Sequence, residues 1–224
     1  MIILGIDTSG KQGGIALWRD GEVLDSAPIE GGTFSAQLIP LVSQLLAKNK
    51  LEKEDIEGFA VASGPGSFTG LRVGLAAVKG LAEILGKPIA TVPVLEALAI
   101  VSGVKGNVVA ILDAQRQEAY VGEYDAADGG AKMLREELHT QAGMIDRARK
   151  ASEAGVAVVT SDSSIASVLA GAGLVVIIVE RPGAAEMART GAGKIARGET
   201  VTVEQLDANY IRVTDAEIFA KPGK

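Results

Sequence analysis

Two stretches far apart in the chain have the same order of residues. The first reads IILGIDTSGKQGGIALW from Ile2, and the second reads VVAILDAQRQEAYVGEY from Val108. In each, an apolar run ends in an aspartate (Asp7, Asp113), a short polar stretch follows, and a second strand-like segment begins. The order of strand, aspartate turn and second strand thus occurs twice, which indicates a duplicated chain.

The residues between the two copies alternate between strand and helix patterns. A hairpin is favoured at Asp20-Gly21, and Pro40 fits only near the first turn of a helix. A longer helix begins at Thr69, a suitable N-cap, and ends before Gly86 and Pro88. In chain order we expect strands at 2–6, 13–18 and 23–29, a helix at 37–48, a strand at 56–62, a helix at 69–85, a strand at 89–92 and a helix at 94–101.

After the second copy the pattern is weaker but of the same kind. We expect a turn at 125–130, strands at 156–159 and 174–179, helices at 164–170 and 184–196, and a polar tail over 204–219 with one short helix or strand. These elements divide the chain into two α/β halves, 1–104 and 105–224. Since both halves begin with a strand, an aspartate turn and a strand, we predict the duplicated α/β fold of the actin-like, ribonuclease H-like class.

Composition restricts the classes of protein further. The 224 residues are 47% hydrophobic, which indicates a folded protein, and the net charge of −6 argues against non-specific binding to nucleic acid. The chain has no cysteine, which excludes disulfides and cysteine nucleophiles. The opening residues lack the basic segment of a signal peptide, and no apolar run reaches the roughly 18 residues that span a bilayer. We therefore expect a cytoplasmic protein without membrane contact.

The segment SGPGSFTGLRVG, from Ser63 to Gly74, joins an expected strand to an expected helix. A glycine-rich turn at this place can cradle a phosphate, and Arg72 would add positive charge. The spacing, however, lacks the lysine of the Walker pattern, and Thr69 stands where the dinucleotide pattern needs glycine. Ser67 follows a glycine directly, which is not the spacing of a nucleophile elbow. We therefore favour close backbone packing over phosphate binding.

The helix after this loop carries two lines of residues. Gly70, Gly74 and Ala77 form a line with almost no side chains, along which another backbone can approach closely. A second, bulkier line repeats at intervals of four and three residues and consists of Leu71, Leu75, Val78, Ala82 and Leu85. One helix cannot bury both lines against its own sheet, so we expect the helix at 37–48 or another chain to cover the other line.

Four segments together resemble the bacterial TsaB (YeaZ) family, which is related to the TsaD, peptidase M22-like proteins. They are the opening ILGIDTSGKQGGIAL, the loop SGPGSFTGLRVGLAAVKGLA, the segment DAQRQEAYVGEY and the tail ANYIR, in the family's order. The chain departs from the family at Thr33-Phe34-Ser35, Gln115 and Asn209, where histidine, arginine and proline are frequent. The resemblance implies a duplicated actin-like fold and a role in making the threonylcarbamoyl modification of the tRNA adenosine beside the anticodon.

The resemblance also implies partners. In this system TsaD carries out the transfer, TsaB is a non-catalytic subunit that binds TsaD, and the ATPase TsaE joins the pair. TsaB proteins also form homodimers through the same surface, which is built by helices of the N-terminal half. We therefore expect a scaffold, not an enzyme, that meets tRNA only through the complex. The expected interface consists of Leu38, Leu41, Leu45, Gly70, Leu71, Gly74, Leu75, Ala77, Val78 and Leu81.

An alternative function is an ATP-dependent phosphotransferase of the sugar-kinase type. In actin-like ATPases, carboxylates placed like Asp7 and Asp113 handle Mg²⁺ or the attacking water, although aspartate is also an ordinary turn residue. The second turn, 114–117, has no glycine, so we expect no tightly bound cofactor and at most ATP or ADP at an interface with TsaD. The candidate nucleotide or anion contacts are Asp7, Thr8, Ser9, Gly64, Gly66, Ser67, Thr69, Arg72 and Asp113.

Metal and RNA contacts have weaker signals. The single histidine, His139, has no second histidine at ligand spacing, so we expect a solvated surface residue and no metal site. Basic residues at 147, 149, 150 and 212 can touch tRNA, but such a group is more typical of a solvated helix face.

Overall fold

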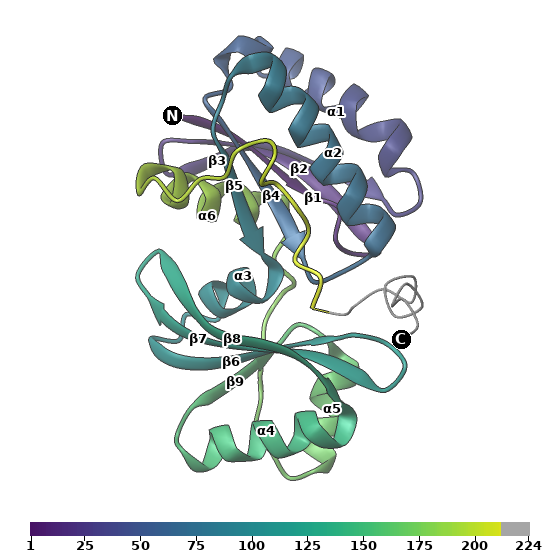
Figure 1. The fold of residues 1–224 in the computed structure, drawn as a ribbon, viewed down its shortest axis with the longest axis vertical. Helices are drawn as coiled ribbons and strands as arrows, with labels where there is room; N and C mark the ends of the chain where they lie inside the picture. Colours follow the sequence, from purple (N-terminus) through teal and green to yellow (C-terminus); the bar gives the residue numbers. More distant parts are fainter. Residues whose placement is uncertain (212–224) are drawn as a thin grey trace, which may run out of the picture.

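The computed structural model describes residues 1–211, which fold around two five-stranded sheets (Figure 1). The first sheet has the strand order β3-β2-β1-β4-β5, and the second has the order β10-β9-β6-β7-β8. The first five strands are β1 (Ile2–Asp7), β2 (Gln12–Arg19), β3 (Glu22–Glu30), β4 (Gly58–Gly64) and β5 (Ile89–Pro93). The others are β6 (Gly106–Asp113), β7 (Glu118–Ala127), β8 (Gly130–Thr140), β9 (Ala157–Thr160) and β10 (Ile177–Ile178).

The two sheets are built in the same way. In each, the first three strands form an antiparallel meander, and the fourth strand runs parallel beside the first. The fifth strand pairs in parallel with the fourth. Asp7 and Asp113 have the same place, as the last residue of the first strand, opposite Gly14 and Ala119. The predicted duplicated α/β fold is therefore confirmed.

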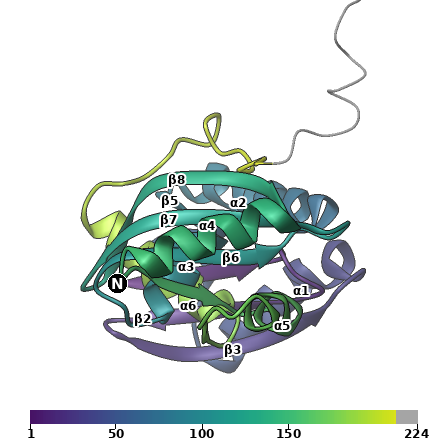
Figure 2. The same ribbon diagram turned by 90° about the horizontal axis from the view of Figure 1, so that it is seen from below.

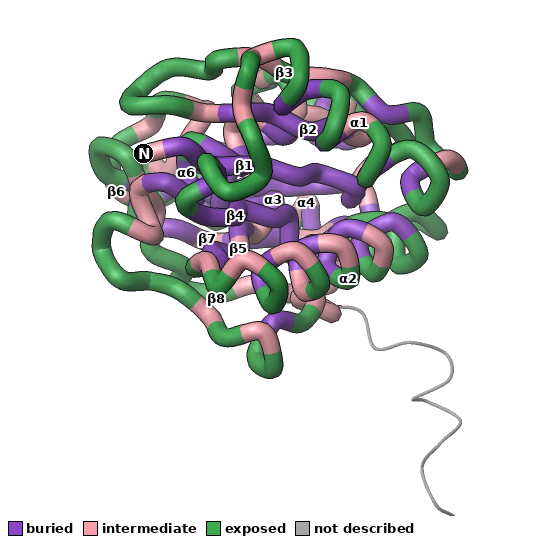
Figure 3. Tube along the Cα trace, turned by 90° about the horizontal axis from the view of Figure 1, so that it is seen from above, coloured by how far each residue is buried: buried purple, intermediate pink, exposed green. Residues whose placement is uncertain are grey.

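The first sheet is covered on both faces. Every residue of β1 and β4 is buried, as expected for central strands with helices on either side (Figure 3). Helices α1 (Phe34–Lys48) and α2 (Phe68–Leu85) lie on one face, and the short 3₁₀ helix η1 (Lys53–Asp55) leads into β4. Helix α6 (Ala184–Ala196) packs on the other face, where Gly191 has no room for a side chain beside Ala60.

The second sheet is covered in the same manner. Helices α4 (Gln141–Glu153) and α5 (Ser163–Gly171) pack on one face and lie in front of the strands in Figure 2. Helix α3 (Val94–Val101) packs on the opposite face, beside β6, β7 and β8. Of its eight residues, Val94–Ala99 are buried, because α3 lies between the two sheets (Figure 1).

The last helix of each half is exchanged between the halves. Helix α3 follows β5 of the first sheet but packs mainly on the second sheet, whereas α6 follows β10 of the second sheet but packs on the first. The chain after α6 also returns to the first sheet, where Val201 pairs with Ile89 and Leu206 joins the core. The strands of the two sheets fall on either side of the expected boundary near residue 104, whereas each sequence half contributes a helix to the other.

Several element boundaries differ from the sequence-based expectations. Helix α1 begins three residues earlier than expected, at Phe34, so Pro40 lies inside the helix. The strand expected at 174–179 is reduced to the two residues of β10. Strand β8 and helix α4 were missed, and part of the tail expected at 204–219 lies outside the described residues.

Candidate functional site

The glycine loop lies against the first turn of the chain, between β1 and β2. The amide of Ser67 donates to the carbonyl oxygen of Ser9 at 2.7 Å. A Cβ at position 66 would collide with the backbone of Ser9, and one at position 70 would collide with the carbonyl of Thr8. The loop thus packs backbone against backbone, which only glycine permits at these two positions. The favoured interpretation, close packing, is confirmed, and its partner is the chain's own turn.

Intramolecular hydrogen bonds occupy several amides that a phosphate cradle would need. Ser9 donates both its amide (2.8 Å) and its hydroxyl (2.6 Å) to Oδ1 of Asp7. The amide of Leu71 donates to the carbonyl of Ser67, and that of Gly70 donates to the Ser67 side chain at 3.3 Å. Ser67, rather than Thr69, is therefore the N-cap of α2. The loop therefore forms the N-terminus of α2 and packs against the turn between β1 and β2.

Asp7 is a buried carboxyl group with an internal set of partners. Burial raises its pKa, while the hydrogen bonds from Ser9 and the positive charge of Arg181 act in the opposite direction. Arg181 lies between β10 and α6 and donates to the Ser9 hydroxyl at 3.4 Å. The segment between β10 and α6, which leads from the second sheet back to the first, therefore places a positive charge beside the Asp7 turn.

The equivalent turn in the second half is built differently. Gln115 donates its amide to Oδ1 of Asp113 at 2.8 Å and its side-chain nitrogen to Oδ2 at 2.9 Å. Gln115, Arg116 and Gln117 all have left-handed backbones, with φ of 62°, 55° and 60°. The amide of Asp113 donates to the side chain of Asp162 at 2.7 Å. Both aspartates thus accept the amide two residues later, and the turns differ in their further contact, which is the Ser67 amide in the first half and the Asp162 side chain in the second.

The candidate anion contacts are divided among several places. Asp7, Thr8, Ser9, Gly66 and Ser67 meet at the first turn. Gly64 has a positive φ of 114° and lies beside the tail, where an added Cβ would be 3.1 Å from the Asn209 carbonyl oxygen. Thr69 and Arg72 are exposed on α2, and Asp113 belongs to the second half.

Most of the expected interface residues are buried inside the chain. Leu71, Leu75 and Val78 lie in the core, and a side chain at Gly74 would collide with the hydroxyl of Thr8. Both lines of residues on α2 are thus used within the molecule, because the glycine line covers the first turn while the bulkier line covers the sheet. The buried members of the expected set are Leu38, Leu45, Gly70, Leu71, Gly74, Leu75 and Val78. Leu41, Ala77 and Leu81 are half-buried and remain accessible.

The solvent-facing sides of α1 and α2 carry a different set of apolar residues, which we call the helix face. Its exposed members are Ile39, Pro40, Phe68, Ala76, Gly80 and Ile84, and its half-buried members are Leu41, Val73, Ala77 and Leu81. Ile39 is 49% exposed and Ile84 is 77% exposed. Lys48, Arg72, Lys79 and Glu83 are the charged residues of the two helices. The sequence carries part of this signal, since Val73, Ala76, Gly80, Leu81 and Ile84 lie outside the two buried lines and are small or apolar.

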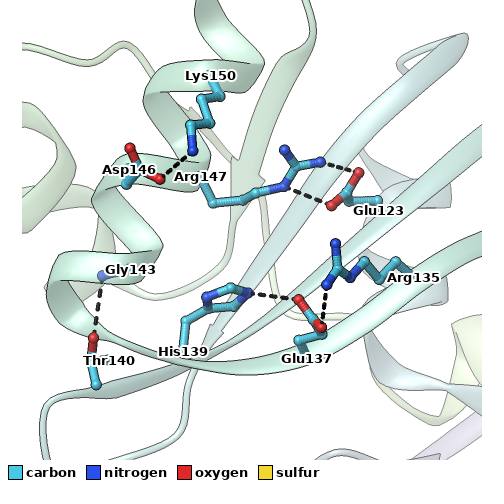
Figure 4. A network of polar contacts seen from close by, with 9 residues as sticks. All are labelled: Glu123, Arg135, Glu137, His139, Thr140, Gly143, Asp146, Arg147 and Lys150. Atoms are coloured by element: carbon cyan, nitrogen blue, oxygen red, sulfur yellow. Dashed lines mark hydrogen bonds and ion pairs between the residues drawn. The ribbon is translucent and has the colours of Figure 1, made fainter.

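His139 lies at the end of β8 among paired charges (Figure 4). Its Nε2 is 3.3 Å from a carboxylate oxygen of Glu137, which also binds Arg135. Close by, Arg147 of α4 forms two contacts with Glu123 of β7. The His139 side chain is 24% exposed, so it is more enclosed than the solvated residue expected. Within residues 1–211, no three His, Asp or Glu side chains lie close enough together to hold a metal ion.

A buried polar cluster connects the exchanged helices with the second sheet. Lys194 of α6 donates to Glu96 of α3 at 2.7 Å. Glu136 of β8 accepts from the Tyr124 hydroxyl and from the Asn209 side chain, the latter at 2.6 Å. Burial is the main cause that raises the pKa of Glu96, Glu136 and Tyr124. Sequence reasoning missed this cluster, since its members come from elements that only the helix exchange brings together.

The fold and the paired aspartate turns define a class, that of the actin-like duplicated α/β proteins. Two solved structures share this fold at low identity: the 2-hydroxyisocaproyl-CoA dehydratase activator of Clostridium difficile (TM-score 0.51, 14% identity, 89% of this chain and 97% of that one) and the ROK hexokinase of Thermus thermophilus (TM-score 0.52, 12% identity, 88% and 100%). These likenesses establish the fold alone.

Closer relatives specify the family. The family model for TsaD, tRNA N6-adenosine threonylcarbamoyltransferase, matches residues 31–157. The tRNA threonylcarbamoyladenosine biosynthesis protein TsaB of Escherichia coli is 30% identical over 225 residues, covering 95% of each chain, and that of Bacillus subtilis is 37% identical over 131 residues, covering 58% of this chain and 57% of that one. YeaZ from Pseudomonas aeruginosa has a TM-score of 0.73 at 25% identity and covers 93% of this chain and 100% of its own. The chain belongs to the TsaB (YeaZ) family, whose named members act in tRNA threonylcarbamoyladenosine biosynthesis.

Proposed function

We propose that the chain is a non-catalytic subunit of the threonylcarbamoylation system that binds TsaD, and with it TsaE, through the helix face. The observation that carries the proposal is the exposed apolar surface of α1 and α2, from Ile39 to Ile84. The proposal keeps the expected partner but moves the interface outward, from the buried residues of α1 and α2 to the exposed ones.

The composition of the helix face supports protein binding. Contiguous apolar surface with few charges is typical of the core of protein interfaces. Helix α4, at the corresponding place in the second half, instead carries Asp146, Arg147, Arg149, Lys150 and Glu153. Small residues such as Ala76 and Gly80 also let a second helix approach α2 closely. A surface of this kind suits a partner with helices of its own.

The geometry of the first turn supports a non-catalytic role. The amides of Ser9 and Ser67 are bound within the chain, and the Asp7 carboxylate already accepts from Ser9. A phosphotransferase needs such groups free to bind a nucleotide. We therefore favour the scaffold over the sugar-kinase alternative.

Further expectations follow from this proposal. A second copy of the chain can cover the helix face when TsaD is absent, which gives a homodimer. ATP or ADP, if it binds, does so at the interface with TsaD, and tRNA is met through the complex in the cytoplasm. Within residues 1–211, no helix is long and apolar enough to cross a membrane.

The test combines binding with reconstituted modification. Purified TsaD, TsaE and TsaC, the protein that makes the activated threonylcarbamoyl-adenylate in this system, are incubated with ATP, threonine, bicarbonate and tRNA, with and without this chain, and modified adenosine is counted. Ile84→Arg places a charge on the helix face, and Val175→Arg is the matched control because Val175 is 86% exposed in the second half. Asp7→Asn tests the turn.

The proposal expects Ile84→Arg to abolish both TsaD binding and modification, while Val175→Arg and Asp7→Asn leave both intact. Normal complex formation by Ile84→Arg would mean that the interface lies elsewhere. Loss of modification in Asp7→Asn with the TsaD complex preserved would instead show that the first turn carries chemistry.

A further inference from the structure

An arginine and two aromatic rings form a cluster at one end of the helix face. The guanidinium carbon of Arg72 lies 3.8 Å from the ring centroid of Phe68, one helical turn earlier on α2. The Tyr210 ring lies 5.4 Å from the Phe68 ring, and Nε of Arg72 donates to the Tyr210 hydroxyl at 3.3 Å. Stacking and the Nε hydrogen bond together fix the direction of the guanidinium group.

The same arginine has unused hydrogen-bonding capacity. Arg72 is exposed and forms no ion pair with any carboxylate of residues 1–211. The Nε bond to Tyr210 leaves the two terminal nitrogens, which carry the donors suited to a bidentate contact with a carboxylate. In a chain with net charge −6, Arg72 thus lies oriented on the helix face without a carboxylate partner among residues 1–211.

The tail that supplies Tyr210 is held by both halves. The amide of Asn209 donates to the carbonyl of Ser63 at 2.7 Å, and its side chain donates to Glu136 at 2.6 Å. The positive φ of Gly64 brings the end of β4 close to the Asn209 carbonyl. Tyr210 therefore reaches Arg72 from a fixed backbone, and the cluster is organised before any partner arrives.

From these contacts we infer that Arg72, oriented by Phe68 and Tyr210, is an anchor that binds an aspartate or glutamate side chain of the partner protein at the edge of the helix face. The inference rests on the proposed function, because it takes the partner to be TsaD docked on α1 and α2. Arginine and tyrosine are enriched among residues that dominate binding energy, and a pre-oriented side chain loses less entropy on binding.

A protein carboxylate fits this cluster better than RNA. Phosphate backbones are bound by several basic groups together, each of which adds to the salt dependence. Along α2 the next basic residue is Lys79, two helical turns from Arg72, and the surface between them is apolar. A single oriented arginine beside apolar residues matches the edge of a protein interface, where a charge pair sets register and association rate.

The experiment measures binding of the full chain to purified TsaD by calorimetry at low and high salt. Arg72→Gln removes the charge, Tyr210→Phe removes the acceptor that orients it, and Ile84→Arg tests the helix face at the other end of α2. We expect Arg72→Gln to weaken binding about tenfold or more at low salt and less at high salt, and Tyr210→Phe to weaken it by a smaller factor. Thermal unfolding of each variant shows whether it is folded.

The partner residue is found by alanine substitution of exposed acidic residues on TsaD. One of these should weaken binding to the wild-type chain but not add to the loss in Arg72→Gln. Unchanged binding of Arg72→Gln, with Ile84→Arg defective, would overturn the anchor and keep the proposed interface, whereas normal binding by both variants would overturn both. If Arg72→Gln weakened only the binding of tRNA and left the affinity for TsaD unchanged, Arg72 would bind a phosphate and not a carboxylate, which would also overturn the inference.

Discussion

The two halves of the molecule share a strand order and an aspartate that accepts the amide two residues later, but they differ in the further contact that holds the turn. In the first half, glycines at 66 and 70 let the loop before α2 touch the backbone of Thr8 and Ser9. In the second half, the Asp162 side chain reaches the amide of Asp113, and no glycine is present in the turn itself. The duplicated fold thus requires the turn to be held, but it does not prescribe the chemistry that holds it.

The outer helices differ in the same way. The solvent-facing sides of α1 and α2 carry exposed apolar residues such as Ile39 and Ile84 and few charges, whereas α4 forms ion pairs such as Lys150 with Asp146. A solvated face of that kind needs no partner, while an apolar one is stabilised when it is covered. This difference is why we place the interface on the first half and use the second half for control substitutions.

The largest effect is expected where the exchanged helices meet. Lys194→Ala would leave the buried Glu96 carboxylate without its cation, which costs about 3–5 kcal/mol of unfolding free energy in comparable buried pairs. Lys150→Ala is the control, because its pair with Asp146 is exposed and should contribute little to stability. Urea unfolding at neutral pH measures both. If Lys194→Ala and Lys150→Ala lowered the unfolding free energy by the same small amount, the helix exchange would not depend on the Lys194–Glu96 ion pair.

A smaller effect is expected at the loop against the first turn. Gly70→Ala would push a Cβ into the Thr8 carbonyl, and we expect a loss of about 1–3 kcal/mol. Gly80→Ala, on the same helix but with open space around it, should gain about 0.5–1 kcal/mol because alanine favours the helix. If the backbone contact at Gly70 is this close, equilibrium unfolding should give a lower unfolding free energy for Gly70→Ala and a higher one for Gly80→Ala. A gain in both would contradict it.

Asp7 is expected to make the stability of the fold depend on pH. The pKa of Asp7 is raised by burial from its ordinary value of 3.8, so the folded state holds a proton that the unfolded state releases. Its contribution is therefore most favourable below pH 3.8 and is lost as pH rises through the raised pKa. Asp7→Asn should flatten the stability–pH curve in this range and keep the bond from Ser9. An unchanged curve for Asp7→Asn would show that its partners offset its burial.

The sequence predicted the parts of the fold that depend on local pattern. The aspartates, the central strands and the close approach of Gly66 and Gly70 all follow from apolar runs and glycine spacing. The exchange of α3 and α6 could not be predicted, because an apolar helix surface does not specify which of two sheets it covers. For the same reason, most of the α2 residues expected at an interface, namely Gly70, Leu71, Gly74, Leu75 and Val78, are buried against the chain's own turn and sheet.

Two elements were not predicted from the sequence, for different physical reasons. Helix α4 has a recognisable N-cap at Thr140 and buried residues at 144, 148 and 151, so its pattern was available in the sequence. Strand β8 was not recognisable in this way, because it is an edge strand whose residues are exposed or half-buried without alternation. The Arg72 cluster was equally hidden, since Tyr210 meets α2 only through the path of the tail.

The smallest expected effect concerns the strained backbone of the second turn. Gln117 has a left-handed φ of 60°, which costs a residue with a Cβ about 1–2 kcal/mol, while its carbonyl accepts from Gln141 and fixes its position. Gln117→Gly should relieve this strain and, after the larger entropy loss of glycine on folding, raise the unfolding free energy by about 0.5–1 kcal/mol. Gln117→Ala keeps the Cβ and should stay near the wild-type value. If glycine destabilises the turn instead, the Gln117 side chain contributes more to stability than its left-handed backbone costs.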